Sequence, residues 1–249
     1  DKQLMINLAG QFQADHLLVV DLPYRLSSWG LDEKESVRLW FDGENLVAWA
    51  ALQSPFWAID YACHADYHSL FKEILAWADG RAQAVMGTPY ERSAWFVNVF
   101  SGQESRKKDL ESLGFACQSD VGDDSWSTLF MKLSAEPKLY EPPAGFTVRP
   151  LGRDAEKYVA LHQSVFESKN MTIEWRGCTL QSPLYKPELD LVVESPTGEL
   201  AAFCICWFNE KLSAGQVEPL GVHADYRQLG LGRVALSHGV SRLRSMGAK

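Results

Sequence analysis

The sequence predicts an α/β protein in which two similar units follow one another along the chain. Each half contains a β-hairpin pattern, then a further strand and a helix with amphipathic spacing. The tetrapeptide His-Ala-Asp-Tyr occurs twice, at 64–67 and 223–226, each time between such a strand and such a helix. A short stretch with several prolines, 134–145, separates the halves and is typical of a linker.

The first half begins its sheet with a hairpin. Val37–Phe41 and Leu46–Leu52 are β-prone runs on either side of an Asp-Gly turn. A strand over 56–63 and a helix starting near Leu70 are expected to follow, because apolar residues recur there at helical spacing up to Ala78. The remaining elements expected in this half are strands over 95–100 and 126–133 and a helix over 106–113 that Gly114 ends.

The pattern of hairpin, strand and helix recurs in the second half. A strand is expected over 146–151, and Asp154 is expected to cap the helix that follows it. Two strands, 189–194 and 200–207, flank the turn 196–199. The last elements expected are a strand over 215–222 and a long helix over 231–246.

These patterns set the expected domains at 1–134 and 145–249, with the boundary near residue 140. The repeated tetrapeptide has the same structural context in both halves, so we interpret it as the trace of a duplication.

Composition excludes several classes of protein. Twenty-four Lys and Arg against 32 Asp and Glu give a net charge of −8, which disfavours a nucleic-acid partner. No apolar run approaches a membrane span, so no membrane partner and a cytoplasmic location are expected. The five cysteines show no disulfide or metal-ligand spacing, and Cys204 and Cys206 are expected to share one face of a strand as reduced thiols. No metal cofactor is expected.

One segment between strand and helix carries the chemistry. Its pattern is Arg227-x-x-Gly230-x-Gly232, at the start of the last helix. The start of a helix has unpaired main-chain N–H groups and the positive end of the dipole, and glycine leaves room for an anion to approach them. The segment is neither a Walker loop nor a dinucleotide fingerprint, because its glycines are spaced differently and no Gly-Lys-Ser/Thr follows.

This segment resembles the acyl-CoA-binding motif of the GNAT superfamily of N-acetyltransferases, Gln/Arg-x-x-Gly-x-Gly/Ala. The resemblance covers about 145–249 and includes the strand Phe146–Pro150. It implies a mixed, mostly antiparallel sheet with flanking helices, in which main chain near the motif holds the pyrophosphate of acetyl-CoA and a strand edge pairs with the pantetheine arm. Ala224 and Gln228 depart from the common motif, which more often has proline and glycine there. The cofactor-binding residues that the resemblance implies are Leu220, Gly221, Val222, Arg227, Gln228, Leu229, Gly230, Leu231, Gly232 and Arg233.

Glu218 lies on the same strand, nine residues before Arg227. In several relatives a glutamate at this spacing is the general base that deprotonates the attacking ammonium. The alternative is a surface carboxylate or one paired within a hairpin, and only geometry distinguishes the two. The family's frequent acid, a tyrosine in a Tyr-x-x-x-Gly-Phe segment, is not found before the last residue, Lys249, so the second domain is expected to be incomplete at its C-terminus.

The first half lacks these chemical groups. When the two tetrapeptides are aligned, His68 lies opposite Arg227, Phe71 opposite Gly230, Glu73 opposite Gly232 and Ile59 opposite Glu218. We therefore interpret 1–134 as a degenerate GNAT-like domain that does not bind CoA in the usual way.

The expected function is N-acetyltransfer: an acyl group, with acetyl the expected one, passes from acyl-CoA to an amine by direct attack. The acceptor is a small-molecule or peptide amine, and a homo-oligomer remains open. The alternative is a non-catalytic module that binds acyl-CoA and regulates a partner.

Overall fold

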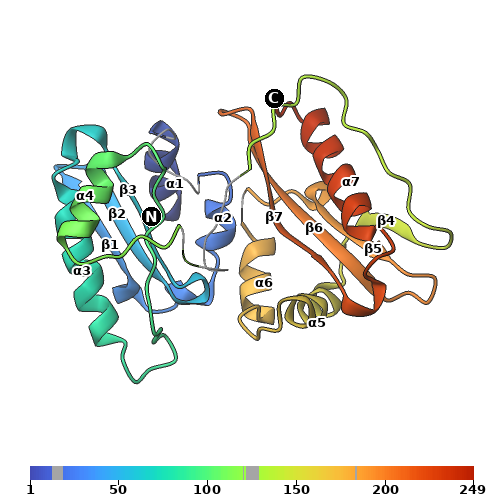
Figure 1. Cartoon of the computed structure of the whole chain (residues 1–249), viewed down its shortest axis with the longest axis horizontal. Coiled ribbons are helices and arrows are strands. Elements are labelled where there is room, and N and C mark those ends of the chain that lie inside the picture. The colour runs from blue at the N-terminus through green and yellow to red at the C-terminus, as the bar shows by residue number, and fades with distance from the viewer. Residues whose placement is uncertain (13–18, 120, 122–128, 183) are drawn as a thin grey trace. The chain divides into compact units, whose positions relative to one another are not determined.

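The computed structural model describes residues 1–12, 19–119, 121, 129–182 and 184–249. The chain forms two compact units (Figure 1). Unit one consists of residues 1–19 and 30–131, and unit two of residues 20–29 and 132–249. Unit two therefore includes a short piece from the front of the chain, which the sequence-based boundary near residue 140 places in the first domain.

Unit one contains a three-stranded antiparallel sheet in the order β1-β2-β3. Two helices cover opposite faces of this sheet. Ala48 and Ala50 pack with Ile74 of one helix, whereas the intervening Trp49 donates its Nε1–H to the Met5 carbonyl of the other at 2.9 Å. The elements of unit one are β1 (Val37–Asp42), β2 (Asn45–Gln53), β3 (Ala58–Cys63), α1 (Lys2–Gln11), α3 (Leu70–Ala84) and α4 (Glu104–Ser112).

Unit two contains a four-stranded antiparallel sheet in the order β4-β5-β6-β7. Its strands are β4 (Thr147–Pro150), β5 (Asp190–Glu194), β6 (Leu200–Asn209) and β7 (Ala214–Val222). Its helices are α2 (Leu22–Arg25), α5 (Ala155–Phe166), α6 (Ile173–Leu180) and α7 (Leu231–Ser245). Short 3₁₀ helices lie at 29–31, 34–36, 54–56, 65–67, 187–189 and 224–226 of the chain.

The helices of unit two cover both faces of its sheet. A Cβ on Gly239 of α7 would lie 2.8 Å from the Cys204 sulfur and 2.7 Å from the Cys206 sulfur, so α7 lies directly on that face. On the other face, a Cβ on Gly221 would lie 2.7 Å from a methyl carbon of Val165 in α5 and closer still to the Phe203 ring. Glycine therefore allows close packing on each side of the same pair of strands.

β7 lies at the edge of the sheet and contains a bulge. Cys204 pairs with Leu220 while Cys206 pairs with Val217, so three steps along β7 correspond to two steps along β6. The extra residue lies in the Glu218–Pro219 segment. A bulge changes the direction of the side chains around it and increases the local twist of the strand.

Most of the expected elements are confirmed. The Asp-Gly hairpin, the helix after each tetrapeptide and the strands of the second half all form. Gly114 follows α4 with φ +87°, a conformation that glycine adopts without strain. The Cys204 and Cys206 sulfurs lie 3.7 Å apart on one face, as the alternation predicts.

Two expected strands are not found in the described residues. Residues 95–100 make only an isolated bridge, in which Phe96 pairs with Ala58. Val97 and Val99 instead pack as irregular chain around Phe71 and Leu75, so apolar burial produced the pattern that suggested a strand. Of the run 126–133, residues 126–128 lie outside the described residues, and 129–133 belong to no strand.

The expected cap of α5 is also wrong. Asp154 occupies the cap position but makes no side-chain hydrogen bond to the helix. Its carboxylate accepts instead from Nη2 of Arg149 at 2.6 Å, and the same guanidinium group binds Glu194. The guanidinium carries a full positive charge, whereas a main-chain N–H at a cap carries only a partial one, so the carboxylate bonds the guanidinium instead.

Across the described parts of the chain, no helix combines the length and the apolar character that crossing a membrane requires.

Candidate functional site

The turn between β7 and α7 is built from main chain in unusual conformations. His223 ends the strand and its Nδ1 accepts from the Asp225 N–H at 3.3 Å, which holds the 3₁₀ turn 224–226. The chain then becomes extended at Arg227. Gln228 and Gly230 follow with φ +65° and φ +78°, both left-handed. This path delays the helix until Leu231 and exposes its first turn.

The first turn of α7 offers hydrogen-bond donors without acceptors. Gly230 caps the helix without a side-chain bond, and no acidic residue lies in the first turn. The first backbone bond into α7 runs from the Val234 N–H to the Gly230 carbonyl. Within the described residues, the N–H groups of 231–233 have no acceptor in the protein. They are the ordinary orphan donors of a helix start, and the helix dipole favours an anion beside them.

The two glycines of the motif have different structural roles. A Cβ on Gly230 would meet no atom within 4 Å, so its side is open, and its positive φ favours glycine. A Cβ on Gly232 would approach Cγ2 of Val222 to 3.2 Å. Gly230 therefore provides the turn and leaves space for a ligand, whereas Gly232 lets the helix lie close to β7.

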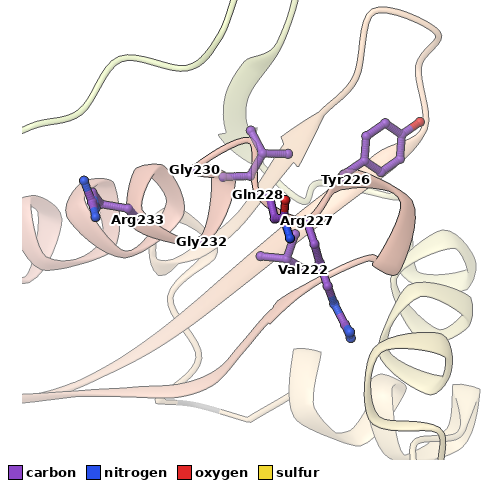
Figure 2. Close-up of a pocket in the computed structure, with 8 residues that line it drawn as sticks. Val222, Tyr226, Arg227, Gln228, Gly230, Gly232 and Arg233 are labelled. Carbon is purple, nitrogen blue, oxygen red and sulfur yellow. The ribbon is translucent and has the colours of Figure 1, made fainter.

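A shallow pocket of about 450 Å³ lies over this turn (Figure 2). In Figure 2 the Arg227 and Arg233 side chains extend in different directions from the glycine turn, so neither covers the main chain between them. The lining residues are Val222, Tyr226, Arg227, Gln228, Gly230, Leu231, Gly232 and Arg233.

Three residues expected to bind the cofactor lie outside this lining. Leu220 packs into the core against α7, and Gly221 is buried beneath Phe203 and Val165. Leu229 is 47% exposed beside the pocket. Any contact that Leu220 or Gly221 makes to a ligand must therefore come from main chain on the free edge of β7.

Tyr226 lines the pocket although it was not among the residues expected there. Its hydroxyl donates to Oε2 of Glu199 at 2.5 Å, and its ring meets the Phe146 ring edge-on at 5.9 Å. The tetrapeptide repeat drew attention to this tyrosine as a duplication signal. The same repeat could have identified it as a residue that fixes the turn.

Glu218 lies half-buried at the bulge of β7. Burial raises the pKa of its carboxyl above the ordinary glutamate value of 4.5, and the Arg25 guanidinium lowers it in part. The main-chain carbonyl of Glu218 accepts from Nε1 of Trp207 at 2.9 Å. A carboxylate with a raised pKa is a better proton acceptor, which is the property a general base needs.

An aromatic layer lies beside Glu218. The Tyr24 ring of α2 stacks on Trp175 of α6 with centroids 5.2 Å apart, and it lies 5.9 Å from the Trp207 ring. All three side chains are buried. Trp207 thus packs in the core and also holds the main chain of Glu218.

A cluster of buried polar side chains comes from α5, α6 and β5. Arg176 is fully buried and pairs with Asp190, which also accepts from the Tyr185 hydroxyl at 2.5 Å. The guanidinium lies 4.3 Å over the Tyr158 ring. His162 of α5 is buried, and its Nδ1 has no hydrogen-bond partner among the described residues. Burial, helped by Arg176, lowers the pKa of His162 to about 4, so it is neutral at pH 7.

The segment that contains this turn matches a family model. Residues 156–249 match the model of the acetyltransferase (GNAT) family, and the whole motif lies within this match. None of the curated proteins compared with the chain matches it.

Solved structures of acetyltransferases resemble the chain. A GCN5-related N-acetyltransferase from Sphaerobacter thermophilus has a TM-score of 0.61 at 18% identity, over 89% of this chain and 71% of that one. The ribosomal-protein-S18-alanine N-acetyltransferase of Escherichia coli has a TM-score of 0.35 at 24% identity, over 41% of this chain and 62% of that one. Saccharomyces cerevisiae N-myristoyltransferase with bound myristoyl-CoA has a TM-score of 0.36 at 19% identity, over 43% of this chain and 28% of that one. At these identities the first similarity shows a shared fold alone, and the other two are too weak to carry an argument.

Proposed function

We propose that the GNAT-family acetyltransferase domain at residues 156–249, together with the rest of unit two, transfers an acyl group from acyl-CoA to an amine. Acetyl-CoA is the proposed donor, and the acceptor is a small-molecule or peptide amine. The observation that carries this proposal is the open turn 227–233, where main-chain N–H groups without acceptors face an uncovered pocket.

The pyrophosphate of CoA fits the chemistry of this turn. It is a doubly anionic group with many acceptor oxygens, and it needs several donors at short range. The N–H groups at the start of α7 supply them, the helix dipole adds favourable charge, and Gly230 leaves the approach open. Arg227 and Arg233 flank the pocket and add positive charge.

The pantetheine arm would run along β7. This strand is bonded on one side only, to β6, so main-chain groups of its other edge are available within the described sheet. An extended chain with amide groups can add to such an edge as a further strand would. On this path the thioester would lie near the bulge that contains Glu218.

Glu218 would act as the general base. An ammonium acceptor gives one proton to the carboxylate, and the neutral nitrogen then attacks the thioester carbonyl carbon. The C–N bond forms and the C–S bond breaks, and the sulfur leaves with the electron pair as CoA thiolate. The nitrogen loses its second proton as it becomes an amide, and the thiolate takes up that proton to leave as CoA thiol. The mechanism needs no enzyme nucleophile, and the Cys204 and Cys206 thiols are buried against α7, where no substrate reaches them.

Acetyl-CoA consumption by the full chain tests the proposal, with amines, amino acids, polyamines and peptides as acceptors. Glu218→Gln should lower kcat by roughly 10²–10⁴-fold, the usual contribution of a general base. Calorimetry should show nearly unchanged CoA affinity in the same variant, because the pyrophosphate site is separate from the base. If CoA affinity collapses together with kcat, Glu218 is not acting as the base.

The same assay separates an enzyme from a regulatory module. Both bind acyl-CoA at the turn, but only the enzyme turns it over. Tight binding without consumption by any acceptor would favour the regulatory module and end the proposal of catalysis.

Unit one is proposed to be a degenerate copy of the same fold. Phe71, which aligns with Gly230, is a buried residue of α3, and Ile59, which aligns with Glu218, is buried in β3. Neither the space for a phosphate nor the base is present at these positions. Unit one is therefore expected not to bind CoA through this turn.

A further inference from the structure

The proline-containing stretch that joins the two halves of the sequence is attached to unit two at two places. The main-chain N–H of Tyr140 donates to Oγ of Ser237 in α7 at 3.1 Å. A few residues later, the Phe146 ring meets the ring of Tyr226 edge-on at 5.9 Å, and Tyr226 lines the pocket over the glycine turn. The end of this linker is therefore part of the surface around the pocket.

Two cationic side chains lie over the ring of Tyr140. Nζ of Lys138 is 4.8 Å from the ring centroid, and Cζ of Arg233 is 5.3 Å from it. Both distances are within the range of about 6 Å over which an aromatic ring attracts a cation. Arg233 and Ser237 are four residues apart on α7 and share one face of the helix, so the bond from Tyr140 to Ser237 brings the ring to Arg233. The linker thus brings a lysine close to an arginine of the pocket.

Neither of these cations has an acidic partner in the described parts of the chain. Lys138 and Arg233 are both exposed, and no ion pair joins either of them to a described carboxylate, including that of Glu141 next to Tyr140. Two like charges repel each other, and an aromatic ring attracts a cation only weakly at an exposed site. An anion bound by both cations would offset this repulsion, so the arrangement suits an anionic ligand.

CoA carries a second anionic group besides its pyrophosphate. A phosphate monoester is attached to the 3′ oxygen of the ribose whose 5′ oxygen carries the pyrophosphate, and its charge is about −1.5 to −2 at pH 7. If the pantetheine arm leaves the pyrophosphate along β7, the ribose leaves it on the other side, towards α7. Arg233 lies there, directly after Gly232, and its side chain points away from Arg227 (Figure 2).

We propose that Lys138 and Arg233, held together over the Tyr140 ring, form a subsite for the 3′-phosphate of CoA. The two cations bind the phosphate, and Tyr140 is a positioning residue for them. The proposal rests on the proposed function, because it requires the pyrophosphate to lie at the turn 227–233. It makes the linker a part of the CoA site, and it predicts a preference for CoA over 3′-dephospho-CoA, which lacks only this group.

Calorimetry of the full chain with CoA and with 3′-dephospho-CoA tests the proposal. The ratio of the two Kd values measures what the 3′-phosphate contributes to binding. The parent chain should bind CoA at least about fivefold more tightly, and the double variant Lys138→Gln with Arg233→Gln should reduce this preference to about twofold or less.

A matched control removes one lysine and one arginine elsewhere in unit two. Lys169 and Arg153 are exposed and lie near the two ends of α5, which covers the face of the sheet opposite to α7. Lys169→Gln with Arg153→Gln changes the net charge by the same amount and should keep the preference of the parent chain. A folding defect weakens the binding of both ligands by one factor and leaves the ratio unchanged.

Two variants of Tyr140 test its positioning role. Tyr140→Phe keeps a ring that can attract both cations, so it should keep the preference for CoA. Tyr140→Leu removes the ring and should lower the preference by about twofold or more. An unchanged preference in Tyr140→Leu would overturn the role of Tyr140.

The outcomes separate this subsite from the proposed function. If the parent chain binds both ligands equally well, the proposed CoA site stands and the 3′-phosphate subsite is overturned. If the double variant of Lys138 and Arg233 weakens both ligands by the same factor, the two cations do not recognise the 3′-phosphate, and the subsite is overturned as well. If neither ligand binds to the parent chain, the proposed function fails, and the subsite fails with it.

Discussion

The two His-Ala-Asp-Tyr turns begin alike and end differently. In both, histidine ends a strand with nearly the same main-chain conformation, φ −61° at His64 and φ −55° at His223. In both, its Nδ1 accepts from the aspartate N–H, at 3.2 Å and 3.3 Å. Each tyrosine donates to a carboxylate beside a hairpin turn, Tyr67 to Asp42 and Tyr226 to Glu199.

The difference starts at the residue directly after the tetrapeptide. His68 is helical with ψ −24°, whereas Arg227 is extended with ψ 159°. After His68 the chain passes straight into α3, and after Arg227 it makes the left-handed turn through Gln228 and Gly230. Both helices have 15 residues, but α7 starts two positions later than α3 in the alignment of the tetrapeptides.

The two turns share the contacts that hold them and differ in the start of the helix, where the anion site is proposed in unit two. The histidine cap and the tyrosine bond hold the turn in both units. The delayed helix start creates the open donors, and it depends on glycine at a position where unit one has the buried Phe71. The repeated tetrapeptide therefore holds the turn in both units, and the residues after it determine whether the start of the helix is open.

The largest expected effect comes from transferring the glycine to unit one. Phe71→Gly removes a ring that packs with Tyr61, Leu75 and Leu110. It should destabilise unit one by about 3–5 kcal/mol, as for other buried Phe truncations. Thermal unfolding measures the loss. Calorimetry should show no second CoA site, and a gained site would contradict the view that the left-handed turn is needed.

The reverse transfer should abolish CoA binding by unit two. Gly230→Phe with Gly232→Glu places at the turn the residues that unit one has there. A bulky ring in the open approach and a carboxylate beside a pyrophosphate should weaken acetyl-CoA binding by roughly 100-fold or more. Gly80→Ala in unit one, where a Cβ would meet no atom within 4 Å, is the control. If the double variant bound acetyl-CoA with the affinity of the parent chain, the turn would not be the CoA site.

Alanine at each glycine separately should distinguish their two roles. Gly230→Ala forces a side chain into a left-handed conformation, with an expected cost of about 1 kcal/mol in stability. Gly232→Ala instead brings a methyl group against Val222. Val222→Ala should therefore restore the stability of Gly232→Ala and leave that of Gly230→Ala unimproved, as unfolding of the single and double variants would show. Equal rescue of both would show that the roles were assigned wrongly.

The smallest expected effect tests the shared part of the turns. Tyr67→Phe and Tyr226→Phe each remove one hydroxyl bond to a carboxylate near the surface. Each should cost about 0.5–1.5 kcal/mol in stability, the usual net value of a hydrogen bond. Only Tyr226→Phe should also weaken CoA binding, because Tyr226 lines the pocket. A similar loss of CoA affinity in Tyr67→Phe would contradict the separation of scaffold and site.

Much of the fold could be predicted from local patterns. The Asp-Gly hairpin, the helices after the tetrapeptides and the strands of unit two follow from spacing and turn chemistry that a few neighbouring residues set. The strand expected at 95–100 was wrong because apolar residues in an irregular segment can be buried without a partner strand. The cap expected at Asp154 was wrong because Arg149 competes for the same carboxylate.

The sequence alone determined where the donors for an anion lie, because a glycine turn before a helix is a local property of main chain. Only the tertiary structure decided what surrounds Glu218. Its burial and the aromatic layer of Tyr24, Trp207 and Trp175 depend on residues far apart in the chain. Charge and burial act through space rather than along the sequence, so no local pattern could show that residues 20–29 pack within the unit that contains β7.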